Sequence, residues 1–374
     1  MSSAQSNIHK LESVKAKPVV RHRRLVTAEE DLLFHLEHGE GFELVVLVGP
    51  TGAGKTTLCS KLVAEVRRRE QDEMTKNPDY VPVVLTRAIA SGPRGFDWRR
   101  LYSDAAKEAG DPFANVRRPD RVATPSQRKI KGEPVTIAGF RLSMEDEFEY
   151  RRTRYWIIDE AAHILSGATS GGMVHQFDVL KSIAQMRKVK IVLVGSYDLA
   201  AYIDCSAQLA RRGVTVHLAR YRLTDKEDKK NFLSCVLTVL RLYPLDGYPG
   251  VTENLDFYCA GCAGCVGILK DWCDRAVARA SLDGRRVLTL DDLRATRLRK
   301  AALETIWKEL LEGEALFVKG DDAEIGALEK LAVAESLTNA RAATETHTAE
   351  KRRCKPGIRN PTRDPVSPLF GTNR

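Results

Sequence analysis

One segment, LVVLVGPTGAGKTTLCSKLV at residues 44–63, constrains the fold more strongly than any other part of the chain. Five apolar residues are followed by a glycine-rich turn and then by apolar residues at helical spacing. Residues 49–56 fit the pattern G-x-x-x-x-G-K-[ST] without a gap, and that pattern is typical of a phosphate-binding loop between a strand and a helix. The segment therefore predicts an α/β fold in which a parallel sheet carries a nucleotide at its carboxyl edge.

Each fixed position of this loop has a physical role in holding a nucleotide. The glycines let backbone N–H groups approach phosphate oxygens, and the following helix adds the positive end of its dipole. We expect Lys55 to reach the β- and γ-phosphates of ATP and Thr56 to offer its hydroxyl to Mg²⁺. A glycine-rich surface turn is the alternative interpretation. The candidate nucleotide-binding residues are Gly49, Pro50, Thr51, Gly52, Ala53, Gly54, Lys55, Thr56 and Thr57.

A second strand-like run, YWIIDE at residues 155–160, ends in two adjacent carboxylates. Because the carboxyl ends of parallel strands meet at one edge, the strand should deliver Asp159 and Glu160 to the phosphate loop. We expect Asp159 to hold Mg²⁺ through water and Glu160 to polarise the water that attacks the γ-phosphate. An acid pair after a strand is a weak signal alone, but beside a phosphate loop it favours ATP hydrolysis over nucleotide sensing.

Composition argues against several other classes of protein. The 374 residues are 43% hydrophobic, which is enough for a packed core domain and a smaller second domain. No run approaches the ~18 apolar residues of a membrane-spanning helix, and the polar start MSSAQSNIHK is unlike a signal peptide. Eight cysteines at irregular spacing indicate a reducing compartment, so a cytoplasmic protein with no membrane partner is expected.

The net charge of +9 is concentrated at the two ends of the chain. Residues 1–24 contain six Lys or Arg and one acid, and residues 351–374 contain seven and one. Basic ends favour a nucleic-acid or acidic partner, although solvated disordered tails are the alternative. The C-terminal end is also proline-rich and carries Leu369 and Phe370, which would suit a peptide that docks on a partner.

Short apolar strands that alternate with helices are predicted up to about residue 221, and helical patterns follow. The expected strands are 43–48, 81–86, 155–158, 190–194 and 214–218. Pro82 limits the second strand to a sheet edge or a strand start. A helix is expected to begin near Thr27, another to cover 289–311, and residues 91–135 are predicted to be irregular.

This order predicts a five-stranded parallel sheet flanked by helices, with a small helical lid. The chain then divides into four parts: a basic disordered segment at 1–24, a nucleotide-binding α/β domain at 25–221, a helical lid at 222–311, and a C-terminal extension at 312–374 with the basic tail.

Four segments together carry a resemblance to a known family. The phosphate loop, WIIDEAAHIL, IVLVGSYDL and QLARRGVTVHLARY resemble the corresponding segments of AAA+ ATPases. More narrowly, the second and fourth are similar to those of bacterial transposition regulators of the TnsC, TniB and MuB type, and the resemblance covers residues 25–310. It implies an ATPase that oligomerises on double-stranded target DNA as a ring or helical filament and recruits or activates a transposase.

The resemblance also implies further residues of the nucleotide site. A polar side chain after the fourth strand would contact the γ-phosphate, and here that residue is Ser196. An arginine from the neighbouring subunit would stabilise the transition state, and Arg211, with Arg212 as the substitute, occupies the expected place before the fifth strand. Lys270 is the candidate basic residue of the lid. The alternatives are a plain turn serine, a cation pair at a helix end and a solvated helix lysine.

A basic stretch between the second and third strands is the candidate DNA contact. Residues 113–131 contain one acid and few aromatic side chains, so contacts to the DNA backbone without base stacking are expected. A solvated basic loop is the alternative. The candidate DNA-binding residues are Arg117, Arg118, Arg121, Arg128, Lys129 and Lys131.

Three cysteines in the predicted lid form the pattern C-x-x-C-x-x-C. Cys259, Cys262 and Cys265 could suggest an iron–sulfur or zinc site. Small residues surround them, and this favours the interpretation that they are thiols packed in the lid.

Two other functions stay open alongside the one that the resemblance implies. The resemblance implies a transposition regulator that works with a target-selection protein and leaves DNA when it hydrolyses ATP. A helicase loader or another remodelling AAA+ ATPase would have the same nucleotide site. A nucleotide switch in signalling would have it too, but should show no DNA-dependent assembly.

Overall fold

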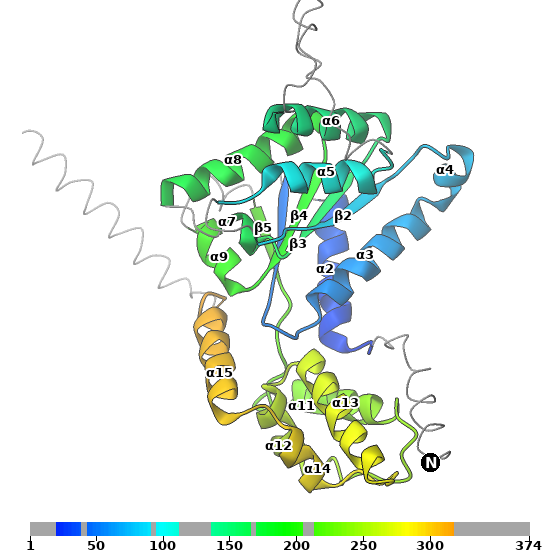
Figure 1. Ribbon diagram of the computed structural model, residues 1–374, viewed down its shortest axis with the longest axis vertical. Coiled ribbons are helices and arrows are strands. Elements are labelled where there is room, and N and C mark those ends of the chain that lie inside the picture. The colour runs from blue at the N-terminus through cyan, green and yellow to red at the C-terminus, as the bar shows by residue number, and fades with distance from the viewer. Residues whose placement is uncertain are drawn as a thin grey trace, which may run out of the picture. The chain divides into compact units, whose positions relative to one another are not determined.

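The computed structural model describes residues 20–38, 43–90, 95–111, 136–165, 170–204 and 213–317. Five strands in these ranges form one parallel sheet in the order β2-β3-β4-β1-β5 (Figure 1). The strands are β1 Leu44–Val48, β2 Val83–Arg87, β3 Tyr155–Asp159, β4 Lys190–Gly195 and β5 Gly213–His217. The predicted five-stranded parallel sheet is confirmed, and each strand lies within about two residues of its expected place.

Burial explains why these five segments form strands. Every residue of β1 and β3 is buried, as expected for the inner strands of a parallel sheet that is covered on both faces. The edge strand β2 begins directly after Pro82, a position where the missing N–H breaks no ladder hydrogen bond. Pro82 allowed a strand at a sheet edge or a strand that starts at the proline, and β2 fits both descriptions.

Helices cover both faces of the sheet. One face packs against α5 Trp98–Glu108, α6 Ile137–Tyr150 and α8 Ser170–Arg187, which contribute residues to one hydrophobic core. The other face packs against α2 Arg23–His38 and α3 Lys55–Arg69 in a second core. The remaining helices of this part are α4 Gln71–Lys76, α7 Ala162–Leu165 and α9 Tyr197–Asp204.

Two predictions about local structure in this part are wrong. The helix expected from Thr27 begins at Arg23, and Val20 and His22 before it are buried, so residues 20–24 belong to the folded domain and not to a disordered segment. Residues 98–108, which were expected to be irregular, form α5. The carboxylate of Asp97 accepts a hydrogen bond from the backbone N–H of Arg100 and so provides the N-terminal cap of that helix.

Five helices of residues 226–315 form the predicted helical part that follows the sheet. They are α11 Lys226–Leu240, α12 Leu255–Cys262, α13 Val266–Leu282, α14 Leu290–Thr296 and α15 Lys300–Ala315. The single helix expected at 289–311 is two helices, because Arg297 adopts an extended backbone conformation that ends α14. Since α15 continues past residue 311, the boundary predicted there falls inside a helix.

The three cysteines of the C-x-x-C-x-x-C pattern lie in the hydrophobic core of this helical part. Cys259, Cys262 and Cys265 are free and buried, and burial raises their pKa above the ordinary value for a thiol. Each therefore remains a neutral thiol that packs as a small apolar side chain. None of the helices in the described ranges is long and apolar enough to cross a membrane.

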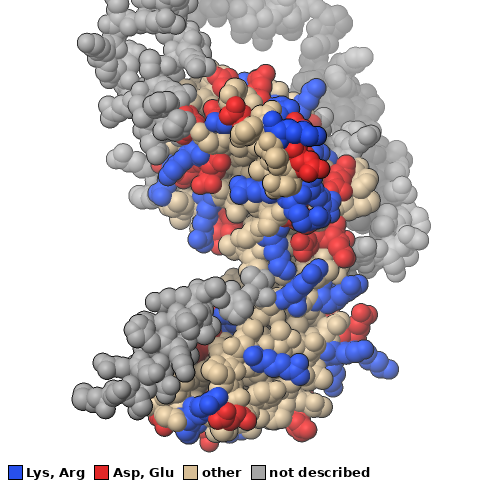
Figure 2. Space-filling model, turned by 90° about the vertical axis from the view of Figure 1, so that its right-hand side faces the viewer, with Lys and Arg blue, Asp and Glu red and all other residues tan. Residues whose placement is uncertain are grey.

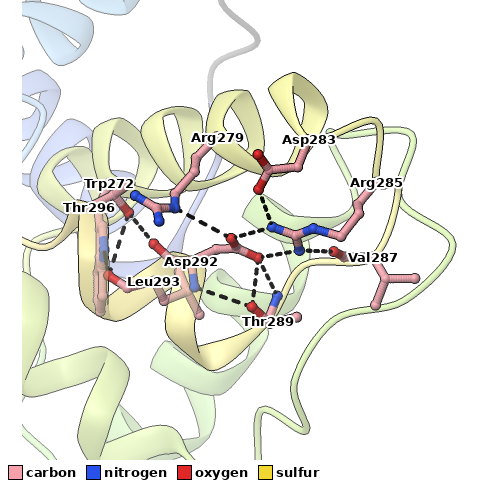
Figure 3. A network of polar contacts seen from close by, with 9 residues as sticks. All are labelled: Trp272, Arg279, Asp283, Arg285, Val287, Thr289, Asp292, Leu293 and Thr296. Atoms are coloured by element: carbon pink, nitrogen blue, oxygen red, sulfur yellow. Dashed lines mark hydrogen bonds and ion pairs between the residues drawn. The ribbon is translucent and has the colours of Figure 1, made fainter.

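A network of charged hydrogen bonds joins α13 to α14 (Figure 3). The buried carboxylate of Asp292 accepts two bonds of 2.7 Å from Arg285 and further bonds from the N–H and hydroxyl of Thr289. Thr289 in turn accepts from the N–H of Asp292, which completes a capping box at the start of α14. These bonds to Asp292 favour its ionised form and hold the pKa of the carboxyl well below its usual range.

Asp292→Asn should lower the free energy of unfolding by about 1–2 kcal/mol, because a capping box and charge-assisted bonds are lost together. Because the pKa of Asp292 is depressed in the folded state, its stabilisation is complete above the unfolded pKa of about 4 and is lost as pH falls below that value. Denaturant unfolding at pH 7 and at pH 3 measures this. Asp291→Asn, at the neighbouring exposed position, is the matched control. Equal unfolding curves for the two variants at pH 7 would contradict the assignment.

Candidate nucleotide site

The predicted phosphate loop joins β1 to α3 as expected. Gly54 provides the N-terminal cap of α3 with φ of 104°, a left-handed conformation that favours glycine. The Lys55 ammonium turns back into the loop and donates hydrogen bonds of 2.9 Å to the carbonyls of Gly49 and Pro50. Burial lowers the pKa of Lys55, and the nearby carboxylates of Glu160 and Asp159 oppose that shift. The loop therefore holds a cation where phosphate oxygens would lie.

The hydroxyl of Thr56 and the carboxylate of Asp159 meet at the carboxyl edge of the sheet. Thr56 Oγ1 donates to Asp159 Oδ2 over 2.8 Å, although the two residues are 103 positions apart in the sequence. Asp159 is almost fully buried at the end of β3, and its other oxygen accepts from the N–H of Glu160. A hydroxyl and one carboxylate are oxygen ligands of the kind that Mg²⁺ uses together with substrate phosphates. The donor set therefore fits the predicted magnesium.

Glu160 occupies a turn with an unusual backbone conformation. Its φ is 55°, which is uncommon for a residue other than glycine, and neighbouring hydrogen bonds from Ala88 N to Asp159 O and from Ala161 N to Val194 O fix the turn between β2 and β4. A conformation of this kind costs about 1–3 kcal/mol and persists where surrounding structure holds it. The turn places Glu160 in the wall of the nucleotide cavity.

One partner of Glu160 is absent from the sequence-based predictions. Arg87, at the end of β2, lies with Nη2 3.4 Å from Glu160 Oε1. The register of β2 on β3 pairs Arg87 with Asp159 and explains this proximity. An arginine that ends a predicted strand was visible in the sequence, but the order of the strands was needed to place it beside the acid pair.

Ser196 follows β4 and lies beside the phosphate loop, as the resemblance implies. The register pairs Val48 with Gly195, so the residues that follow β1 and β4 begin at the same edge. Ser196 lines the cavity together with Thr51, and its hydroxyl donates to Asp198 over 3.3 Å. To donate to a terminal phosphate, its single O–H would turn away from Asp198.

The start of α13 closes the cavity from the lid side. The N–H of Gly267 donates to the carbonyl of Gly52 in the phosphate loop over 2.8 Å, and a Cβ on Gly267 would lie 2.5 Å from that oxygen. Lys270, one turn later, lines the cavity, and its ammonium donates to Asp274 over 3.1 Å. Lys270 thus lines the cavity with a carboxylate of its own helix as its partner, and its contact with a nucleotide stays a prediction.

The whole cavity has a volume of about 370 Å³. Its lining combines the phosphate loop and the predicted Glu160, Ser196 and Lys270 with residues that were not predicted. The additional lining residues are Val20, His22, Leu25, Val266, Gly267 and Asp271.

The N-terminal segment forms one wall of this cavity. The ring of the buried His22 shares a hydrogen bond of 3.2 Å with the hydroxyl of Tyr221, and burial, assisted by Lys61, lowers its pKa to about 4. His22 is therefore neutral near pH 7. Together with Val20 and Leu25 it offers an apolar wall that suits the base of a nucleotide. Sequence reasoning missed this wall because residues 1–24 were judged by their charge alone.

The remaining predicted residues lie outside the described ranges. These are the finger candidates Arg211 and Arg212 and the DNA-contact candidates Arg117, Arg118, Arg121, Arg128, Lys129 and Lys131. Their roles stay predictions.

A comparison with family models finds a match for the part of the chain that carries the site. Residues 39–203, which include the phosphate loop, the acid pair and Ser196, match the family model described as an AAA domain. The match covers less than half of the chain, so these residues are similar to an AAA domain. Such domains in general hydrolyse nucleotides. No curated protein matches the sequence.

Two solved structures are similar to this chain at low sequence identity. ORC1 of Aeropyrum pernix, solved in complex with DNA, is 15% identical with a TM-score of 0.52, over 75% of this chain and 65% of that one. ORC2 of the same organism, solved in ADPNP–ADP complexes, is 16% identical with a TM-score of 0.48, over 80% and 69%. This chain spans about two thirds of the length of ORC1, and at such identity the likeness is one of fold. The narrower resemblance to transposition regulators stays a prediction.

Proposed function

We propose that the protein is a magnesium-dependent ATPase that assembles on double-stranded DNA in its ATP form and regulates transposition in the bacterial cytoplasm. The observation that supports the ATPase part best is the arrangement at the carboxyl edge of the sheet. There the phosphate loop, with Thr56, and Glu160 line one cavity, and Asp159 lies directly behind Thr56, whose hydroxyl donates to it.

The residues of the site divide the chemistry of hydrolysis among them. Backbone N–H groups of the loop and Lys55 bind the phosphates, and Thr56 with Asp159 would hold Mg²⁺, which when bound neutralises phosphate charge. Glu160 orients the attacking water and accepts its proton, so the γ-phosphate leaves as inorganic phosphate and ADP remains. Ser196 donates to the γ-phosphate. Arg211 or Arg212 of a neighbouring copy would stabilise the transition state, which would make turnover depend on assembly.

DNA binding is proposed for the basic stretch at 113–131. On the face drawn in Figure 2, Lys and Arg side chains are interspersed with Asp and Glu, as is usual for a solvated surface. The basic stretch, in contrast, holds all six candidate cations in a short span with one acid. Contacts of these cations with phosphates would be tolerant of sequence and sensitive to salt. A transposase and a target-selection protein are the proposed protein partners.

A helicase loader is the second candidate function. The fold likeness to ORC1, a protein solved with DNA, suits such a role about as well as it suits a transposition regulator. Both candidates bind DNA and ATP, so they differ in the protein that the ATP-bound assembly recruits. A signalling switch is a weaker candidate, because a positioned general base has no role in a protein that only senses nucleotide.

Electron microscopy of the full chain with duplex DNA tests the proposal. We expect rings or filaments on DNA with a slowly hydrolysed ATP analogue and free particles with ADP. Pull-down with the assembled protein then separates the two candidates, since a regulator should retain a transposase and a loader should retain a helicase. Free particles with both nucleotides would contradict DNA-dependent assembly, and only the ATPase part of the proposal would then remain.

Replacing Arg117, Arg118 and Arg121 together with alanine should weaken DNA binding by about tenfold or more and equally on unrelated sequences. Each lost phosphate contact should also reduce the slope of log affinity against log salt by about 0.9. Fluorescence anisotropy at several salt concentrations measures both quantities. Arg294, Lys300 and Lys308, which are exposed in the lid, provide a control variant with the same loss of charge. Equal affinity of the two variants would move the DNA-binding face elsewhere.

A further inference from the structure

The C-terminal end of α15 packs on the residue that follows Ser196. A Cβ on Gly313 would lie 2.1 Å from the ring of Tyr197, so only glycine allows the helix to approach this closely. Tyr197 is buried, and its hydroxyl shares a hydrogen bond of 2.9 Å with Nε2 of His217. The His217 ring stacks on Phe317 with centroids 4.2 Å apart and planes 16° from parallel. Tyr197, His217 and Phe317 are named the α15 clamp below.

Two residues of the clamp belong to elements that lead to the nucleotide site. Tyr197 begins α9 directly after Ser196, which lines the nucleotide cavity. His217 ends β5 and pairs in register with Val48, the last residue before the phosphate loop. A shift of the α15 end must therefore move the residue next to Ser196, the end of β5, or both, because close-packed groups cannot be displaced independently.

A buried ion pair fixes the same end of α15. Glu314 Oε1 lies 2.9 Å from Nε of Arg220, three residues after β5, and both side chains are almost fully buried. Arg222 adds a second contact of 3.1 Å to Glu314, and Arg220 also lies over the ring of Trp307 at 4.7 Å. The end of α15 is thus attached to the segment that follows β5 by charge as well as by packing.

The clamp stays uncharged near neutral pH. Burial lowers the pKa of His217 to about 4, and burial together with Glu314 raises that of Tyr197 above its ordinary value. At His217 the Glu314 carboxylate opposes the shift, and Arg222 and Arg24 lower the pKa further. His217 and Tyr197 are therefore both neutral near pH 7, and the contact between them is one of packing and a neutral hydrogen bond.

We propose that the α15 clamp is a positioning device for hydrolysis. Through Tyr197 it fixes Ser196, and through His217 it fixes the end of β5, so that ATP turnover depends on where the end of α15 lies. This inference rests on the proposed ATPase function and deepens it, because it assigns a regulatory input to the helix that leads into residues 318–374. A partner that displaces α15 would slow hydrolysis without occupying the nucleotide cavity.

Two variants test the clamp by different means. Gly313→Ala inserts a methyl group between α15 and the Tyr197 ring, and Phe317→Ala removes the stack on His217. We expect each to lower kcat for ATP about tenfold while the Kd for a fluorescent ATP analogue changes less than threefold. Phe317→Tyr keeps the stack and should retain the rate. Glu304→Ala, at an exposed position of the same helix, is the control.

If the clamp had only a structural role, Gly313→Ala and Phe317→Ala would lower the melting temperature and would change kcat and Kd together. Unchanged kcat in both Gly313→Ala and Phe317→Ala would overturn the inference. Hydrogen exchange of peptides over 190–200 and 213–218 provides a readout that needs no turnover, and Gly313→Ala should raise exchange at least threefold there. If the wild type hydrolyses no ATP, the proposed function fails, and the exchange result alone then decides for or against the clamp.

Discussion

Replacing Glu160 with glutamine should lower the turnover number for ATP by about a hundredfold or more, which is the usual effect of removing a positioned general base. Glutamine has the same shape and can still occupy the turn, but it cannot accept a proton from the attacking water. Nucleotide affinity should change little, because the hydrogen bonds of Lys55 and Thr56 are made to the loop carbonyls and to Asp159, and not to Glu160. Its contact with the exposed Arg87 is of the kind that contributes little to stability.

Steady-state release of phosphate and equilibrium binding of a fluorescent ATP analogue measure the two quantities separately. Glu73→Gln, which changes an exposed glutamate of α4, is the matched control. If hydrolysis releases the protein from DNA, Glu160→Gln should also accumulate as ATP-bound assemblies on duplex DNA. Normal turnover in this variant would show that another group activates the water.

The features that were predicted correctly are those that short stretches of sequence determine. The phosphate loop is a contiguous pattern, and buried parallel strands are contiguous apolar runs, so β1, β3 and β4 were all located. The convergence of Thr56 and Asp159 could also be predicted, because the carboxyl ends of parallel strands meet at one edge of a sheet. No knowledge of a particular long-range contact was needed for that prediction.

The features that were missed depend on contacts between distant parts of the chain. Arg87 lies beside Glu160 only because β2 is the neighbour of β3, and strand order is not a local property. His22 is buried, and its hydrogen-bond partner Tyr221 lies 199 residues later in the chain. The charge of the N-terminal segment predicted solvent exposure, and tertiary packing overrode it for residues 20–24.

The end of the lid was missed for a related reason. The apolar pattern of 289–311 is continuous enough to suggest one helix, and no Pro or Gly marks the break at Arg297. The continuation of α15 to Ala315 is stabilised by the buried Glu314, whose partner Arg220 lies 94 residues earlier. A glutamate near a predicted boundary normally indicates a solvated surface, so the sequence favoured the opposite interpretation.

Gly267→Ala should weaken ATP binding by roughly 30- to 100-fold, which corresponds to about 2–3 kcal/mol and is at the upper end of the usual cost of overpacking. The added Cβ would lie 2.5 Å from the carbonyl oxygen of Gly52, and backbone atoms on both sides cannot rotate away as a flexible side chain could. Either α13 moves outward or the phosphate loop deforms. Both responses separate the lid from the loop and remove the wall that Val266 and Lys270 provide.

Equilibrium binding of a fluorescent ATP analogue measures this effect, and thermal unfolding without nucleotide shows whether the lid itself remains folded. Gly247→Ala is the matched control in the lid, because a Cβ there meets its nearest neighbour, Val287, at an ordinary 3.7 Å. We expect the control to bind ATP normally. Normal affinity of Gly267→Ala would mean that the contact between α13 and the phosphate loop is absent when ATP is bound, and the lid would then close on the nucleotide through Lys270 and the N-terminal wall instead.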